Sequence, residues 1–231
     1  TVYVNNLLTD GCFYKGQLYW TQHKESGDNA TFSVMDVQPP LTATMLRITS
    51  TDQQSNYILQ NNPVISSARE YTLSGYIKTE NVQTTGMGAG LKVSTTNNRT
   101  FYSELLEGTT DTDVNDGFER VSVTFTLQEG ESIDYVAAGL YSASGNVYID
   151  CLQLEEGGAP NQVNLLDNSG FERFANSVPD SFSVSPSSLS VSSGAARSGS
   201  KGAQITGTAG AERSIYQTMP LSGSAGDVYS F

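Results

Sequence analysis

Few side chains in this 231-residue sequence could act as nucleophiles, acid–base groups or metal ligands. His23 is the only histidine, and it lies in the polar stretch TQHKESGDN, which is typical of a loop. The sequence lacks the G-x-S-x-G turn of a serine nucleophile, the H-E-x-x-H pair of a zinc protease and the glycine-rich phosphate loop. Two cysteines and one histidine are too few for structural zinc, which usually takes four protein ligands. We therefore expect a protein that is not an enzyme.

Acidic residues dominate the charged part of the sequence. The stretch DTDVNDG at Asp111 is similar to a calcium loop, but its glycine comes one position late and no glutamate closes it, so we interpret it as a connection between strands. Over the whole chain, 24 Asp and Glu outnumber 12 Lys and Arg, which gives a net charge of −12. A phosphate backbone would be repelled, so we expect no nucleic-acid partner. Neutral ligands, divalent cations and basic partners remain open, and no apolar run is long enough for a membrane span.

Alternation with period two predicts the elements that position these residues. In YTLSGYIKT, the apolar side chains of Tyr71 and Ile77 fall on one face of a strand, while Ser74, Tyr76 and Lys78 fall on the other. RVSVTFTL alternates in the same way, and YVAAGLYSASGNVYIDCLQL is typical of two strands joined by a turn around the Gly-Asn pair at 145–146. No segment keeps a helical period over three turns. The pattern predicts an all-β fold, either a sandwich or a barrel.

An opening motif occurs twice. NLLTDGCFYKG at Asn6 returns as NLLDNSGFERF at Asn164, which is 158 residues later (164 − 6). Phe13 and Phe171 keep the same offset, and several later segments also recur in the same order. Similarity at a fixed offset indicates tandem domains.

The repeat divides the chain into three parts. We expect a complete unit at 1–158, a linker at 159–163 that includes Pro160, and the front of a second unit at 164–231. Because half of a sandwich leaves strand edges unpaired and an apolar face uncovered, we expect the second unit to take cover from a neighbour or to be poorly ordered. The partners expected on this basis are neighbouring repeats of the same chain.

The same segments, in order, carry a family resemblance. NLLDNSGFE, YTLSGYIKT, GFERVSVTFT and GNVYIDCLQLEEG resemble the carbohydrate-binding-module jelly roll of the xylan- and glucan-binding type, within the galactose-binding-like group. The tandem form resembles modules in large surface proteins of Gram-positive gut bacteria, including wall-associated YD-repeat proteins. The resemblance covers nearly all of 5–157 and the front of the second unit. It implies a jelly-roll β-sandwich, one complete unit followed by an incomplete copy, in a secreted or surface-anchored bacterial protein.

The resemblance also implies that the chain binds a polysaccharide or another glycan on the concave face of the sandwich. A sugar ring has an apolar CH face and a polar rim, which suits tyrosine and tryptophan. The residues expected to bind it are Tyr76, Lys78, Ser74, Tyr141 and Gln60. Trp20 takes the position of Phe182 in the second copy, where the family has a buried aromatic, so we expect it in the core. Exposed tyrosines also stabilise sheets without any ligand, so the alternative is a structural spacer or adhesin repeat that binds no sugar.

A structural calcium is a further implication of the resemblance, between the segment after the first FE motif and an acidic pair on the last strand. The second copy keeps Glu172 there, whereas the first has Tyr14, and Asp150 is followed by Cys151 where two acids are usual. The expected metal ligands are therefore Asp150 and Glu172. Because the first and last strands are neighbours in this fold, Cys12 and Cys151 are candidates for a disulfide worth roughly 4–5 kcal/mol. The alternative is a pair of buried thiols.

Overall fold

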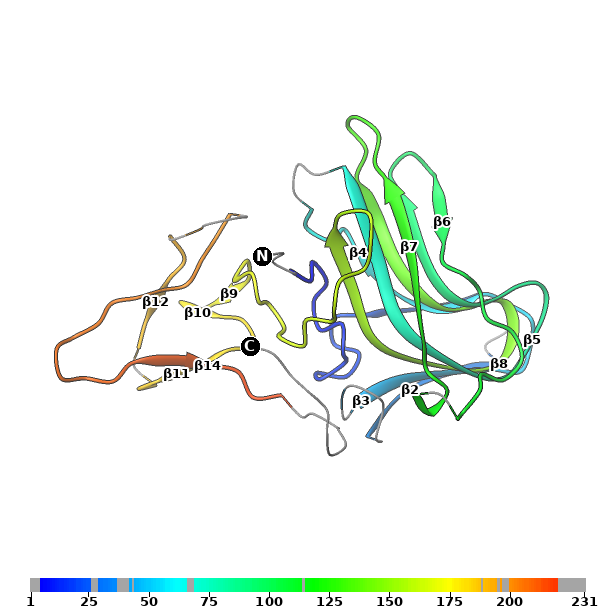
Figure 1. The fold of residues 1–231 in the computed structure, drawn as a ribbon, viewed down its shortest axis with the longest axis horizontal. Helices are drawn as coiled ribbons and strands as arrows, with labels where there is room; N and C mark the ends of the chain where they lie inside the picture. The colour runs from blue at the N-terminus through cyan, green and yellow to red at the C-terminus, as the bar shows by residue number, and fades with distance from the viewer. Residues whose placement is uncertain are drawn as a thin grey trace.

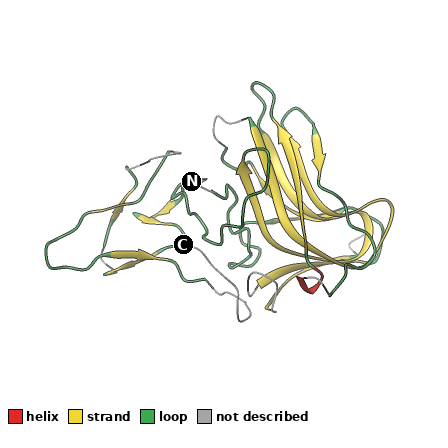
Figure 2. Ribbon diagram, viewed as in Figure 1, coloured by secondary structure: helices red, strands yellow, loops and turns green. Residues whose placement is uncertain are grey.

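The computed structural model describes residues 5–25, 29–36, 42, 44–65, 69–113, 115–187, 189–194, 196 and 200–219. Within these ranges the chain is built from β-strands, with a single 3-10 turn at Asn115–Gly117 (Figure 2). The prediction of an all-β protein is therefore confirmed. Among the described residues, no helix has the length and apolar character needed to cross a bilayer.

One antiparallel sheet contains eight strands. Their bounds are β1 (Thr21–Lys24), β2 (Ala30–Asp36), β3 (Thr44–Ser50), β4 (Asn56–Asn61), β5 (Glu70–Thr95), β6 (Thr100–Tyr102), β7 (Glu119–Thr126) and β8 (Ile133–Glu156). The 26-residue β5 and the 24-residue β8 pair along most of their length and curve together (Figure 1).

The curvature of β5 and β8 folds the sheet into two layers. In the front layer, the first half of β8 pairs with β4, which pairs with β1, and the second half of β5 pairs with β6. In the rear layer, the second half of β8 pairs with β3, which pairs with β2, and the first half of β5 pairs with β7. The result is a β-sandwich in which two strands belong to both layers.

The bend of β8 corrects one prediction. The sequence around Gly145 predicts a hairpin turn between two strands, but β8 continues through it without interruption. Gly145 has a φ of +114°, and a Cβ there would lie 2.5 Å from the carbonyl oxygen of Asn81. A glycine that permits a sharp bend with a close backbone approach has the same sequence signature as a glycine in a turn.

A single apolar core fills the space between the layers. It includes Tyr71, Leu73 and Ile77, which confirms the inward side of the alternation predicted for that strand. Trp20 is buried, as expected, against the ring of Phe13, with ring centroids 5.6 Å apart. Residues 5–20, which we call the strap, have no strand of their own and pack along the end of β8.

The described residues between 174 and 216 form three short ribbons beside the sandwich (Figure 1). The ribbons pair β9 (Phe174–Ala175) with β10 (Val178–Pro179), β11 (Ser183–Ser185) with β14 (Ser214–Tyr216), and β12 (Val191–Ser192) with β13 (Gln204–Ile205). Ahead of the ribbons, the chain repeats a hydrogen bond of the strap. Leu166 N donates to Asn164 Oδ1, as Leu8 N donates to Asn6 Oδ1.

Candidate functional site

Aromatic side chains gather on the outward side of the front layer. Alternate residues of its strands enter the core, so the residues between them point outward. We call the outward side chains of Tyr57, Lys92, Tyr102, Tyr135 and Tyr141 the aromatic face. They come from β4, β5, β6 and β8, and they pack together apart from the core cluster.

Small residues form the floor beneath these rings. Tyr57 lies opposite Gly139 in the register between β4 and β8, and a Cβ on Gly139 would approach the Cβ of Tyr57 to 2.6 Å. Gly90 lies beside Gly139 on β5, and a Cβ there would lie 2.8 Å from Leu105 Cδ2. The two glycines therefore allow bulky side chains to lie directly against the backbone of the sheet.

The tyrosine rings are arranged in a supporting layer and an accessible layer. Tyr141 is almost fully buried, and its ring centroid lies 5.4 Å from that of Tyr57 and 5.3 Å from that of Tyr102. Tyr57 is also buried, and its ring is nearly parallel to that of Tyr135, at 10° with centroids 6.4 Å apart. Tyr102 and Tyr135 are half-buried, so part of each side chain is accessible to solvent.

His23 extends this arrangement onto β1. Its ring stacks on that of Tyr57, with centroids 4.3 Å apart and an angle of 14° between the planes. The interpretation of this segment as a loop is wrong, because Thr21–Lys24 forms an edge strand paired with β4. His23 covers one side of Tyr57, so it serves as an outer ring of the cluster.

Lys92 provides a cation at the centre of the aromatic face. Its Nζ lies 5.3 Å from the ring centroids of both Tyr57 and Tyr135 and 5.9 Å from that of Tyr102, which is cation–π geometry. No acidic residue in the described part of the chain forms a salt bridge with it. Burial acts to raise the pKa of Tyr135, but hydrogen bonding with Lys92 and Tyr57, together with the charge of the ammonium group, lowers that pKa overall, whereas burial raises the pKa of Tyr57.

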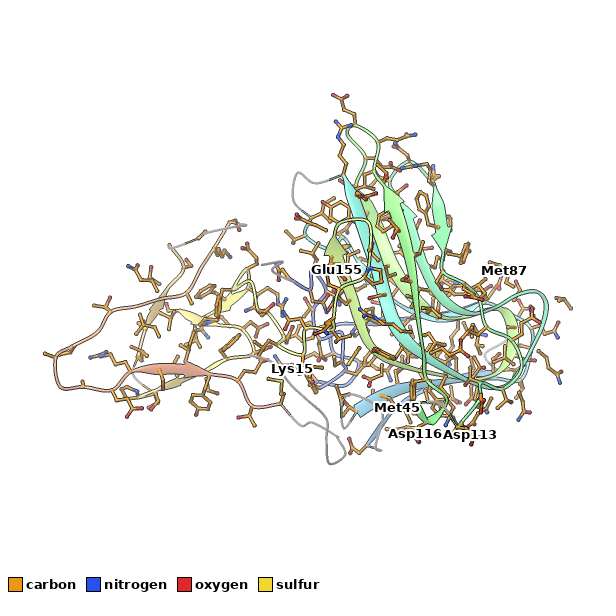
Figure 3. All side chains as sticks on the ribbon, viewed as in Figure 1. Lys15, Met45, Met87, Asp113, Asp116 and Glu155 are labelled. Atoms are coloured by element: carbon orange, nitrogen blue, oxygen red, sulfur yellow. The ribbon has the colours of Figure 1, made fainter. Side chains whose placement is uncertain are left out.

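The residues predicted to bind glycan are not brought together. Tyr141 belongs to the buried layer of the aromatic face, whereas Ser74, Tyr76 and Lys78 point outward from the rear layer, on the opposite side of the sandwich. Met87 packs with the tyrosines of the aromatic face, and Met45 packs with Tyr76 on the rear layer. The two methionines lie well apart in Figure 3. The alternation was correct within the strand at Tyr76, but alternation does not identify which layer a strand belongs to.

Each of the three rear-layer residues has a structural partner. Ser74 is fully buried, and its hydroxyl accepts a hydrogen bond from Arg120 Nη2 at 3.2 Å. Tyr76 is half-buried in a small cluster with Met45 and other apolar side chains. The ammonium group of Lys78 lies 5.7 Å from the ring centroid of Tyr148. Ser74 is therefore not available to a ligand.

Gln60 is engaged with the strap. Its Oε1 accepts from the backbone N–H of Thr9 at 2.9 Å, and its Nε2 donates to the carbonyl oxygens of Thr9 at 2.9 Å and Tyr19 at 3.3 Å. The side chain holds the strap against β4, which is a structural role.

The residues predicted to hold calcium are also separate. Asp150 is buried and accepts from the hydroxyl of Thr42 at 3.0 Å, while the Glu172 carboxylate accepts from the backbone of Ser200 and Lys201 at 3.0 and 3.2 Å. Among the described residues, the histidine, cysteine and carboxylate ligand atoms that gather with the Asp150 carboxylate are two thiol sulfurs. Calcium takes oxygen ligands, so the donors around Asp150 do not fit it.

The comparisons with known proteins concern the fold. No family model matches the sequence, and no curated protein matches it. Among solved structures, the chain is similar to the CBM22-1 xylan-binding domain from Paenibacillus barcinonensis Xyn10C, with 17% identity and a TM-score of 0.45 over 69% of this chain and 99% of that one. It is similar to the tandem CBM22-1-CBM22-2 domain of the same protein, with 14% identity and a TM-score of 0.46 over 93% of this chain and 61% of that one.

A viral structure shows a likeness of the same strength. The enzymatically active domain of tailspike protein 4 from bacteriophage CBA120 matches with 12% identity and a TM-score of 0.46 over 65% of this chain. The matched part spans only 21% of the tailspike chain. Across these proteins the chain is similar to β-sandwich modules, most of them carbohydrate-binding modules.

Proposed function

We propose that this chain is a non-catalytic module that binds glycan on its aromatic face. The observation that carries the proposal is the convergence of four tyrosines and Lys92 from four strands on one outward surface. A tyrosine ring packs against the apolar CH face of a sugar, while its hydroxyl and a nearby ammonium group bond the sugar hydroxyls. Neither the rings nor the lysine contributes a carboxylate for acid–base chemistry.

The positions of the two half-buried tyrosines, Tyr102 and Tyr135, favour an extended ligand over a small enclosed one. The half-buried rings of Tyr102 and Tyr135 come from different strands, β6 and β8, and Lys92 lies between them. Because β5 lies between β6 and β8, these two strands are roughly 10 Å apart, and a chain of sugars lying across them would contact both rings at once.

Affinity gel electrophoresis with soluble plant and bacterial wall polysaccharides tests the proposal. With a polysaccharide that retards the wild type, we expect Tyr135→Ala and Lys92→Met each to lose roughly tenfold in affinity. Tyr76→Ala is the matched control, because Tyr76 is also a half-buried outward tyrosine but lies on the rear layer. Loss of binding in Tyr76→Ala with full binding in Tyr135→Ala would move the site to the rear layer.

A second candidate function is that of a structural spacer between domains. The observation that favours it is the linker, which lies bound against the rear layer. Glu155 is buried, and its carboxylate accepts from the backbone N–H of Asn161 at 2.9 Å and from the amide side chain of the same residue at 2.6 Å. Gln153, also buried, accepts from the backbone N–H of Asn164 at 2.9 Å. Such a linker fixes the direction in which the chain leaves the sandwich.

Polar contacts continue the junction beyond the linker. Asp167 Oδ1 accepts from the backbone N–H of Asp10 at 3.2 Å, and Lys15 Nζ lies 3.0 Å from Ser181 Oγ and 3.7 Å from Asp180 Oδ1. Lys15 and Glu155 both lie on the side of the sandwich nearest residues 164–219 (Figure 3). These contacts support a second module that begins at 164 and is held in a set orientation to the first.

Small-angle scattering of the full chain tests the spacer function. We expect Glu155→Ala to release the linker and increase the radius of gyration, because it removes both bonds to Asn161. Glu156→Ala is the control, since Glu156 is the adjacent residue and is exposed. An unchanged scattering profile in Glu155→Ala would contradict a linker held by this side chain. Failure of every polysaccharide to bind would leave the spacer as the function.

A further inference from the structure

Two cysteines far apart in the sequence lie side by side. Cys12 belongs to the strap and Cys151 to β8, and their Sγ atoms are 2.7 Å apart. Both side chains are buried, with 6% and 0% of their surface exposed. The described residues contain no other cysteine, so each thiol has one possible sulfur partner.

The backbone holds this pair in place. The strap runs antiparallel to the end of β8, with Leu7 N donating to Leu154 O at 2.8 Å and Leu152 N donating to Gly11 O at 2.9 Å. Cys12 follows Gly11 in the strap, and Cys151 precedes Leu152 in β8, so the two cysteines flank the second of these bonds. The two residues therefore meet because of the pairing of the strap with β8.

The surroundings of the pair do not suit a metal ion. The thiols and the Asp150 carboxylate form a buried group of three possible ligands within 4.8 Å, among the described residues. Structural zinc needs a fourth protein ligand, and calcium needs oxygen atoms. Asp150 supplies the one carboxylate of this group, so the group lacks the set of oxygen ligands that calcium takes.

We propose that Cys12 and Cys151 form a disulfide, which links the strap to the end of β8. Two thiols give one S–S bond, two protons and two electrons. A disulfide oxidant such as oxidised glutathione accepts the electrons and protons and becomes two thiols. This proposal does not depend on glycan binding.

The electrostatics of the pair favour retention of the bond in the folded protein. Burial raises the pKa of Cys151. Hydrogen bonding to Cys151 acts to lower the pKa of Cys12, but burial and the carboxylates of Asp150 and Asp10 raise it overall. A sulfur whose thiol has a raised pKa is a poor leaving group, and burial shields the bond from external thiolates, so the disulfide exchanges slowly once the strap has packed.

Mass spectrometry of the full chain, after exposure to oxidised glutathione, tests the proposal directly. The protein is denatured in urea and treated with iodoacetamide, with or without prior reduction. We expect no alkylation without reduction and two alkylated cysteines after it, and a non-reduced digest with the two cysteine peptides linked. Two alkylated cysteines without reduction would overturn the proposal.

Thermal unfolding provides the second measurement. Because the bond closes a loop of 139 residues, we expect reductant to lower the Tm by about 10 °C, and EDTA to leave it unchanged. The double variant Cys12→Ala/Cys151→Ala is the control, and its Tm should not respond to reductant. A Tm that falls with EDTA and not with reductant would overturn the disulfide in favour of a metal. Should the double variant fail to fold, the mass measurement on the wild type decides.

Discussion

Gln217 holds the backbone of Asp167 through the same two hydrogen bonds by which Gln60 holds that of Thr9. In each case the side-chain oxygen accepts from the backbone N–H, at 3.0 and 2.9 Å, and the amide nitrogen donates to the carbonyl of the same residue, at 3.0 and 2.9 Å. A glutamine can satisfy both groups of one residue, as a neighbouring strand would. A glutamine side chain thus holds the start of each segment.

Gln60→Ala should therefore destabilise the first unit. The substitution removes three hydrogen bonds and leaves partly buried backbone groups of Thr9 without partners, which we expect to cost about 2–3 kcal/mol. Urea denaturation measures the loss. Polysaccharide binding at the aromatic face should remain, and selective loss of binding with unchanged stability would instead return Gln60 to the ligand site.

Glu131 should stabilise the protein at neutral pH and cease to do so in acid. The side-chain hydrogen bond from Arg99 is the main cause that lowers the pKa of Glu131 to about 2, from 4.5. A lowered carboxyl pKa gives stability that is present above pH 4.5 and is lost as the pH falls toward 2. The Tm of Glu131→Gln should be lower than that of the wild type at pH 7, and the two should converge by pH 2. An equal difference at both pH values would contradict the ion pair.

Asp150 should have the opposite effect. Burial raises its pKa from 3.8 to about 6, so its ionisation destabilises the folded state. The stability it contributes is full below pH 3.8 and is lost as the pH rises through 6. Asp150→Asn should keep the bond from Thr42 and be more stable than the wild type at pH 8, by up to about 3 kcal/mol. Urea denaturation at pH 5 and pH 8 checks this, and a variant that is less stable at pH 8 would show that the charge is compensated.

Gly139→Ala should disrupt the floor of the aromatic face. A Cβ at this position would lie 2.5 Å from Asn56 O and 2.6 Å from Tyr57 Cα, and neither backbone atom can move without shifting β4. We expect a loss of about 2–3 kcal/mol in stability. Gly86→Ala is the control, because no atom lies within 4 Å of its added Cβ, and it should be close to neutral. Equal stability of the two variants would contradict the close approach of β4 and β8.

The sequence predicts features that lie within one strand better than features that cross strands. Alternation correctly assigned Tyr71 and Ile77 to the core, because the side-chain period is a local property of extended backbone. The aromatic face combines Tyr57, Lys92 and Tyr135 from three strands, and only the register between β4, β5 and β8 brings them together. The register between strands cannot be read from the sequence of any single segment.

The error at His23 has a different origin. The strand that carries it is short and lies at the edge of the sheet, where few side chains face the core, so its sequence is polar like that of a loop. The stacking of His23 on Tyr57 follows from the pairing of β1 with β4 and could not be read from composition.

The pairing of the strap with β8 also determines how the module would respond to force. The start of the strap and the end of β8 lie side by side, at Leu7 and Leu154. Tension applied between these two ends would peel the strap from β8 one hydrogen bond at a time, beginning at this pair. With Cys12 bonded to Cys151, peeling would stop at that link. Strands β1 to β7, the part of β8 before Cys151 and the whole aromatic face lie between the two cysteines. The Cys12–Cys151 bond would then bear the mechanical load, and the strands that carry the aromatic face would not.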